Sequence, residues 1–88
     1  MAYTVSWKKK LEKSIRKMPQ TEQKKFAQLV HDLNENGPMQ EKWPNFSKLG
    51  PDEYHCHLSY SWAACWKNKK NSIVIEVYYV GSRESAPY

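Results

Sequence analysis

The spacing of apolar residues changes once along this chain, from a helical period in the first half to strand-like runs in the second. Residues 8–36 place apolar side chains three and four positions apart, which is typical of amphipathic helices. From residue 54 onward, β-branched and aromatic residues form short runs that favour strands. A chain of 88 residues has room for one compact core. We therefore expect a single α+β domain over residues 1–88.

Two helices are predicted before residue 38. The first covers residues 8–17, and Pro19 separates it from the second, which Thr21 is expected to cap. Gly37 and Pro38 end the second helix, because glycine accepts the conformation that follows a helix and proline cannot continue it. The apolar positions that share one face are Trp7, Leu11, Ile15 and Met18 in the first helix, and Phe26, Leu29, Val30 and Leu33 in the second. Both stripes need a common partner surface.

Four strands are predicted, at residues 2–7, 54–59, 62–67 and 72–80. Turns at residues 60–61 and 68–71 join the last three as an antiparallel meander. The order is then β-α-α-β-β-β, with the helical hairpin packed on the antiparallel sheet. The proline-rich segment 38–52 is predicted to be a loop whose Trp43 and Phe46 tuck against the core.

The turn at residues 60–61 also predicts a register for the hairpin that contains the histidines. It would set Cys56 opposite Cys65 and His55 opposite Trp66. Successive side chains of a strand point to opposite faces. One face would then carry His55, His57, Ala64 and Trp66, and the other Cys56, Leu58, Ala63 and Cys65.

The histidines and cysteines of this hairpin allow two chemical interpretations. Imidazole and thiolate are zinc ligands, but on the predicted register the histidines and cysteines face opposite ways. We therefore expect no metal site, and reduced, buried thiols at Cys56 and Cys65. His55 and His57, with Arg83 within reach, could instead cleave RNA, because histidine transfers protons and arginine binds phosphate. The alternative is that both histidines are ordinary strand residues.

No Gly-rich phosphate loop or G-x-S-x-G motif occurs in the sequence, so no organic cofactor is expected. No apolar run is long enough to span a bilayer, and no signal peptide is evident. These features favour a cytoplasmic protein without a membrane partner.

Basic residues are concentrated near the N-terminus. Residues 7–25 hold eight basic and two acidic side chains, a net charge of +6. Such a surface attracts polyanions such as nucleic acid, although it could also be a solvated helix face. The basic residues are Lys8, Lys9, Lys10, Lys13, Arg16, Lys17, Lys24 and Lys25.

Several short motifs resemble those of the RelE/ParE superfamily of bacterial toxins. They are the K-L-G segment at residues 48–50, H-C-H-L at 55–58, A-C-W at 64–66, E-V-Y-Y-V-G at 76–81, V-G-S-R-E at 80–84 and A-P-Y at 86–88. The resemblance implies a microbial-ribonuclease-like fold and the toxin of a type II toxin–antitoxin pair. Its partner would be a cognate antitoxin whose disordered segment folds across the toxin.

In RNA-cleaving members of the superfamily, the toxin acts on messenger RNA in the ribosome without a metal. Carried over to this chain, the resemblance implies that the catalytic residues are His55, His57, Arg83 and Tyr88. The expected RNA-binding residues are Lys8, Lys9, Lys10, Lys13, Arg16, Lys17, Lys48 and Trp66.

The chain departs from the superfamily pattern at its middle strands. Residues 54–66 contain no lysine or arginine, and Ser59 stands where RNA-cleaving relatives tend to have arginine. Either histidines perform the proton transfers, or the protein is a degenerate binding module. A third interpretation is a DNA gyrase inhibitor like the ParE branch.

Overall fold

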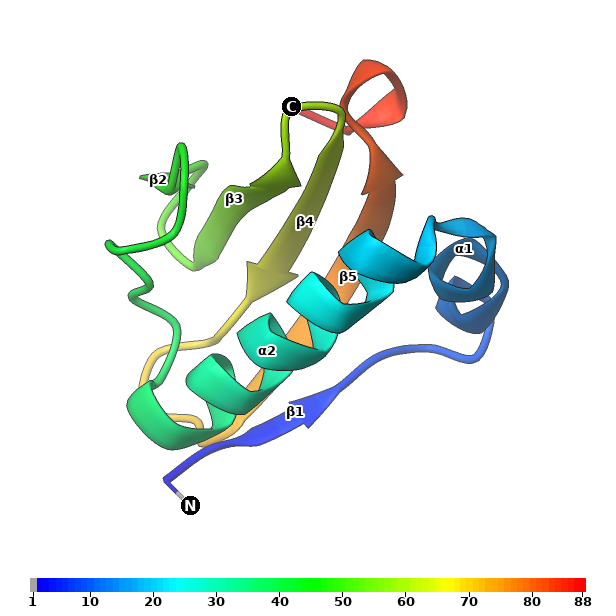
Figure 1. Ribbon diagram of the computed structural model, residues 1–88. Coiled ribbons are helices and arrows are strands. Elements are labelled where there is room, and N and C mark those ends of the chain that lie inside the picture. The colour runs from blue at the N-terminus through cyan, green and yellow to red at the C-terminus, as the bar shows by residue number, and fades with distance from the viewer. Residues whose placement is uncertain (1) are drawn as a thin grey trace.

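The computed structural model describes residues 2–88, in which helices pack on one face of a five-stranded sheet (Figure 1). The sheet order is β1-β5-β4-β3-β2, with β1 parallel to β5 and the other neighbours antiparallel. The elements are β1 (Thr4–Ser6), α1 (Leu11–Lys17), α2 (Gln20–Asn36), β2 (Ser47–Lys48), β3 (Glu53–Ser59), β4 (Trp62–Lys67), β5 (Val74–Ser82) and a 3₁₀ helix (Arg83–Ser85). The predicted α+β class is confirmed.

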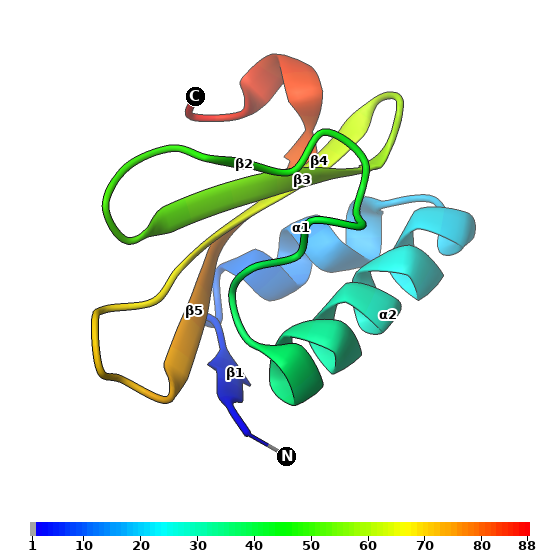
Figure 2. The ribbon, with the colours of Figure 1, turned by 90° about the vertical axis from the view of Figure 1, so that its left-hand side faces the viewer.

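Both helices lie on the same side of the sheet, as Figure 2 shows. The predicted apolar stripes point inward: Leu11 and Met18 are buried, as are Phe26, Leu29 and Leu33. The sheet contributes the other side of this core, from Cys56, Leu58, Ala64, Trp66, Ile75, Val77 and Val80. Among residues 2–88, no helix is long and apolar enough to cross a membrane.

The two helix starts differ from the prediction. α1 begins at Leu11, because Lys8 to Lys10 form a turn in which the Leu11 N–H donates to the Lys8 carbonyl over 2.9 Å. α2 begins at Gln20 with Pro19 at its N-cap, so the predicted cap at Thr21 is wrong. Thr21 already lies inside the first turn. The Gln23 side chain instead joins the two helices by donating to the Met18 carbonyl over 2.9 Å.

Gly37 ends α2 as predicted, with φ of 93° and its N–H donating to the Leu33 carbonyl over 2.9 Å. A Cβ at this position would lie 2.8 Å from Cε1 of the Tyr3 ring. Both the positive φ and this close approach favour glycine.

Gly37→Ala is therefore expected to lower the free energy of unfolding by about 1–3 kcal/mol. Urea denaturation of the purified variant measures the loss. Gly50→Ala is the matched control, because a Cβ there meets no heavy atom within 4 Å, and its effect should stay within about 0.5 kcal/mol. Equal losses for the two variants would contradict this account of Gly37.

The segment predicted as a loop contains the short strand β2. Ser47 pairs with His55 and Lys48 with Tyr54, so this segment forms the edge of the sheet next to β3. As predicted, Trp43 and Phe46 pack against the core.

The predicted β3–β4 register is wrong by one residue. His55 pairs with Cys65, Cys56 with Ala64 and Tyr54 with Trp66. A β-bulge between His57 and Ser59 absorbs the extra residue next to the turn. Trp66 and Ala64 therefore face the helices, whereas Cys65 joins the face that carries the histidines.

Candidate active site

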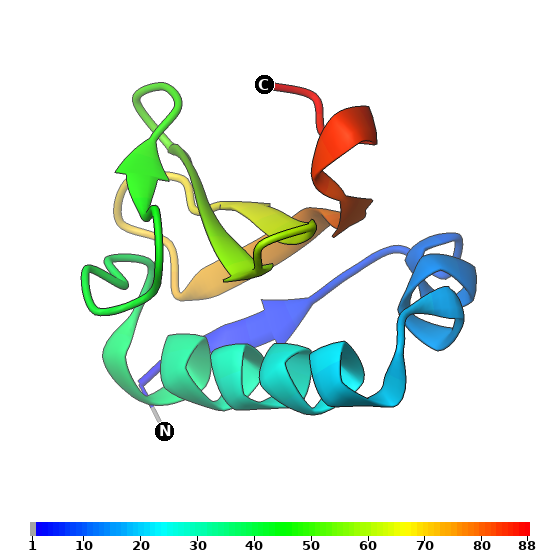
Figure 3. The same cartoon turned by 45° about the horizontal axis from the view of Figure 1, so that its top comes forward.

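The face of the sheet away from the helices carries His55 and His57. Figure 3 shows the helices on one side of the sheet and the C-terminal segment on the other. The predicted alternation of His55 and His57 with Cys56 is confirmed, because Cys56 belongs to the core on the helix side. We call the surface around the two histidines the open face.

Tyr88 returns to the open face and closes a cluster with both histidines. Its hydroxyl lies 3.3 Å from Nε2 of His57, and its ring centroid lies 4.1 Å from that of His55. Nδ1 of His55 lies 3.0 Å from the Ser47 hydroxyl, and the two histidine rings are 5.7 Å apart. Three of the four predicted catalytic side chains are thus in one place.

Both histidines are well covered, at 7% exposure for His55 and 9% for His57. Burial lowers the pKa of His55, with a smaller lowering from His57 and an opposing effect of the Ser47 backbone. Burial also lowers the pKa of His57, and the nearby charge of Arg83 lowers it further. Because imidazole ordinarily titrates near 6.5, both rings are mainly neutral at pH 7 and can accept a proton.

Arg83, the fourth predicted catalytic residue, lies at the start of the 3₁₀ helix beside His57. A pocket of about 310 Å³ joins them and is lined by Lys25, Pro44, Asn45, His57, Leu58, Ser59, Tyr60 and Arg83. Two cations and a neutral imidazole therefore border one cavity, a combination suited to phosphate. We call this cavity the phosphate pocket.

Lys25 and Ser47 were not predicted as site residues. Lys25 belongs to the basic N-terminal stretch, and the packing of α2 against β3 places it in the lining of the same pocket as His57. Ser47 reaches His55 through β2, a strand too short for its sequence to indicate.

The expected RNA-binding residues are scattered over the structure. Lys8 to Lys10, Lys13, Arg16 and Lys17 are exposed on α1 and the turn before it, and Arg16 pairs with Glu12 at 4.0 Å. Lys48 is exposed at the sheet edge, with its ammonium 5.9 Å from the centre of the Tyr54 ring. It therefore lies on the helix side, away from the histidines.

The predicted position of Trp66 beside the histidines is wrong. The side chain is 0% exposed, belongs to the core, and donates from Nε1 to the Pro38 carbonyl over 3.0 Å. The shifted register turns it toward the helices, where it cannot stack on an RNA base.

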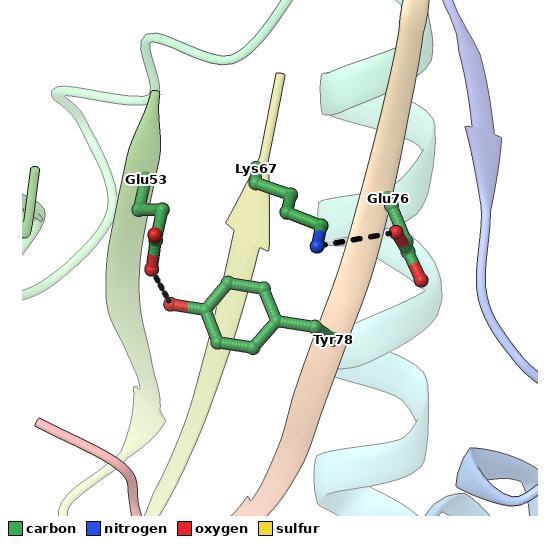
Figure 4. Close-up of polar contacts among 4 residues, drawn as sticks. All are labelled: Glu53, Lys67, Glu76 and Tyr78. Atoms are coloured by element: carbon green, nitrogen blue, oxygen red, sulfur yellow. Dashed lines mark hydrogen bonds and ion pairs between the residues drawn. The ribbon is translucent and has the colours of Figure 1, made fainter. Parts of the chain in front are cut away.

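The other end of the open face carries a polar strip, shown in Figure 4. The Tyr78 hydroxyl reaches across β4 and donates to Glu53 over 2.8 Å, and Lys67 pairs with Glu76 at 3.7 Å. Lys8 and Lys10 line a small cavity beside this strip. The charged side chains of the strip are bonded to partners within the strip. The phosphate pocket, in contrast, has two cations and no carboxylate in its lining.

Neither cysteine is poised for chemistry. Both are free and buried, as predicted, and burial raises the pKa of each thiol to about 12. The corrected register places Cys65 on the histidine face, which removes the argument from opposite faces. Even so, residues 2–88 contain no group of three metal-ligating side chains close enough to hold an ion.

No protein-family model matches the sequence, and no curated protein matches it significantly. Solved structures do match. The RelE chain of the archaeal RelE–RelB complex from Pyrococcus horikoshii has a TM-score of 0.77 at 19% identity, over 98% of this chain and 100% of that one. The isolated E. coli RelE toxin has a TM-score of 0.73 at 22% identity, over 98% and 89% of the two chains.

A YoeB dimer from Staphylococcus aureus also matches, with a TM-score of 0.69 at 13% identity, over 92% of this chain and 97% of that one. The protein therefore has the fold of RelE and YoeB toxins.

Proposed function

We propose that this chain, whose fold is that of RelE toxins, is itself the toxin of a type II toxin–antitoxin pair and cleaves messenger RNA on the ribosome. The observation that carries the proposal is the hydrogen-bonded pair of His57 and Tyr88 beside the two cations of the phosphate pocket. An antitoxin partner follows from the same proposal, because RelE and YoeB chains occur in complexes with RelB and YefM.

Cleavage would begin at His57. When Nε2 carries the ring proton and donates a hydrogen bond to the Tyr88 oxygen, Nδ1 is the nitrogen that can accept a further proton. It takes the proton of an RNA 2′-hydroxyl while that oxygen bonds to phosphorus and the bond from phosphorus to the 5′-oxygen breaks. The 5′-oxygen takes the Tyr88 hydroxyl proton, and Tyr88 takes the Nε2 proton of His57, which is left neutral with the former 2′-hydroxyl proton on Nδ1. The products are a 2′,3′-cyclic phosphate and a 5′-hydroxyl.

Arg83 and Lys25 would neutralise the charge that builds on the phosphate oxygens during this step. Lys25 thereby supplies, from α2, the positive charge that residues 54–66 lack. His55 would act as a positioning residue, because it packs against the Tyr88 ring and is itself held at Ser47. The exposed lysines of α1 and its preceding turn would bind ribosomal RNA through phosphate contacts.

Induced expression in a bacterial host, with mapping of messenger RNA 5′ ends, tests the proposal. We expect cuts in phase with codons in the natural chain and none with Arg83→Ala. Growth arrest without cuts would contradict RNA cleavage, and lost DNA supercoiling in the same cells would identify a gyrase inhibitor. The absence of arrest would indicate a degenerate toxin.

Lys25→Ala should reduce cleavage by about 10- to 100-fold, because it removes one of the two cations that face the scissile phosphate. Lys24→Ala is the matched control. Lys24 is the sequence neighbour of Lys25 and is also exposed, but it does not line the phosphate pocket. Initial rates of cleavage on purified ribosomes give both values. Equal effects of the two substitutions would indicate a general charge effect in place of a phosphate contact.

Cleavage should depend on pH through His57. A base must be neutral, so the rate is expected to be level above the pKa of His57 and to fall as pH drops below it. Burial and Arg83 both lower this pKa, and the midpoint of kcat/KM should therefore lie below about 6.5. A pH profile of cleavage measures it, and a midpoint above the ordinary histidine value would contradict the assignment.

A further inference from the structure

The turn between β3 and β4 presents an aromatic ring to solvent and is bonded to Arg83 beside the phosphate pocket. Tyr60 is 85% exposed. The Arg83 guanidinium lies 5.2 Å from the centre of the Tyr60 ring, and its Nη1 donates to the Tyr60 carbonyl over 3.0 Å. The Arg83 backbone N–H also donates to the Ser61 carbonyl over 2.9 Å. These contacts fix the turn to the start of the 3₁₀ helix.

A second cavity, of about 480 Å³, lies between this turn and the 3₁₀ helix. Its lining residues are Tyr60, Ser61, Trp62, Ser82, Arg83 and Glu84, and we call it the turn pocket. It shares Tyr60 and Arg83 with the phosphate pocket. A nucleotide whose phosphate binds at Arg83 and His57 could therefore extend directly into the turn pocket.

We infer that the turn pocket holds the RNA base that flanks the cleaved phosphate on the side away from Tyr88, and that Glu84 selects this base. The inference rests on the proposed function and adds a recognition site to it. Exposed tyrosine and arginine planes are the groups on which proteins stack unpaired bases. The pocket pairs one cation with one carboxylate, so it suits a neutral ring better than a second phosphate.

The expected selectivity follows from the chemistry of Glu84. An ionised carboxylate only accepts hydrogen bonds, so it favours bases that carry an amino group. Cytosine and uracil make the sharpest comparison, because they have the same size and differ at C4, where cytosine has an amino group and uracil an oxygen. The turn pocket should therefore prefer cytosine to uracil.

The test uses two sets of RNAs. Within each set, the RNAs differ only in having cytosine or uracil as the base that flanks the cleaved phosphate on the side away from Tyr88. One set is translated on ribosomes and scored for cleavage, and the other consists of short single strands with a 2′-O-methyl group at the cleavage position, scored for binding to the purified protein. The natural chain should prefer cytosine by about tenfold in both assays. Glu84→Gln should bring this ratio close to one, whereas Glu35→Gln, which removes the same charge from the exposed end of α2, should keep it.

Tyr60→Ala should weaken binding and cleavage of both RNAs by about tenfold through loss of stacking, and Tyr60→Phe should restore them. Unchanged cleavage and binding in Tyr60→Ala, or an unchanged ratio in Glu84→Gln, would overturn the inference while leaving the proposed function intact. Binding that depends on Tyr60 and Glu84 without cleavage by the natural chain would support the turn pocket and overturn the proposed function. No binding preference in the natural chain would overturn the inference.

Discussion

Replacing His57 with alanine is expected to slow the proposed cleavage of messenger RNA by about 100- to 10,000-fold, the usual contribution of a positioned proton-transfer group. His57 combines a lowered pKa, a contact of 3.3 Å to the Tyr88 hydroxyl and a position in the phosphate pocket. Single-turnover cleavage on saturating ribosomes would measure the chemical step apart from binding.

His31→Ala is the matched control for this substitution, because His31 is exposed on α2 and does not line the phosphate pocket. Its rate should match that of the natural chain. Thermal unfolding of both variants shows whether they are folded. A folded His57→Ala protein that cleaves at the natural rate would rule out proton transfer by this side chain.

The largest expected change in stability is that of Trp66→Ala, at about 3–5 kcal/mol of unfolding free energy. Trp66 is completely buried, stacks near Phe46 and Tyr54 with centroids 6.1 and 6.3 Å away, and bonds to the Pro38 carbonyl. Removing the indole leaves a large cavity between the sheet and the 38–52 segment. Domains of this size are stable by only about 5–15 kcal/mol, so much of the variant could be unfolded at 37 °C.

Trp66→Phe helps to separate the contribution of ring packing from that of the hydrogen bond to Pro38. It keeps an aromatic ring and removes the indole N–H and part of the side-chain volume. It should cost clearly less than Trp66→Ala in urea denaturation. A loss below about 1 kcal/mol for Trp66→Ala would be inconsistent with a core position.

The fold was predictable because its two main signals are local. The apolar stripes of α1 and α2 determine which helix faces are buried. Alternation along β3 puts His55 and His57 on one face of the sheet, whatever the register between β3 and β4. The register itself depends on a bulge between His57 and Ser59. No residue type there demands a bulge, so the faces of Trp66, Ala63, Ala64 and Cys65 could not be read from the sequence.

The candidate site was only partly predictable for a related reason. His55, His57, Arg83 and Tyr88 could be proposed from proton chemistry and from the resemblance. Lys25 is far from β3 in sequence, and its place depends on the angle at which α2 crosses the sheet. Tyr60 and Glu84 form a pocket only because the backbone of Arg83 bonds back to the turn.

The parallel pairing of β1 with β5 joins segments that lie far apart in the sequence, since Thr4 lies opposite Val74. A ribosome makes β1 first and β5 last among these strands, so β1 does not gain this neighbour until residues 74–82 have emerged. Contacts between such distant segments slow folding. The enzyme proposed here would therefore acquire its activity only after β5 has been made and has paired with β1.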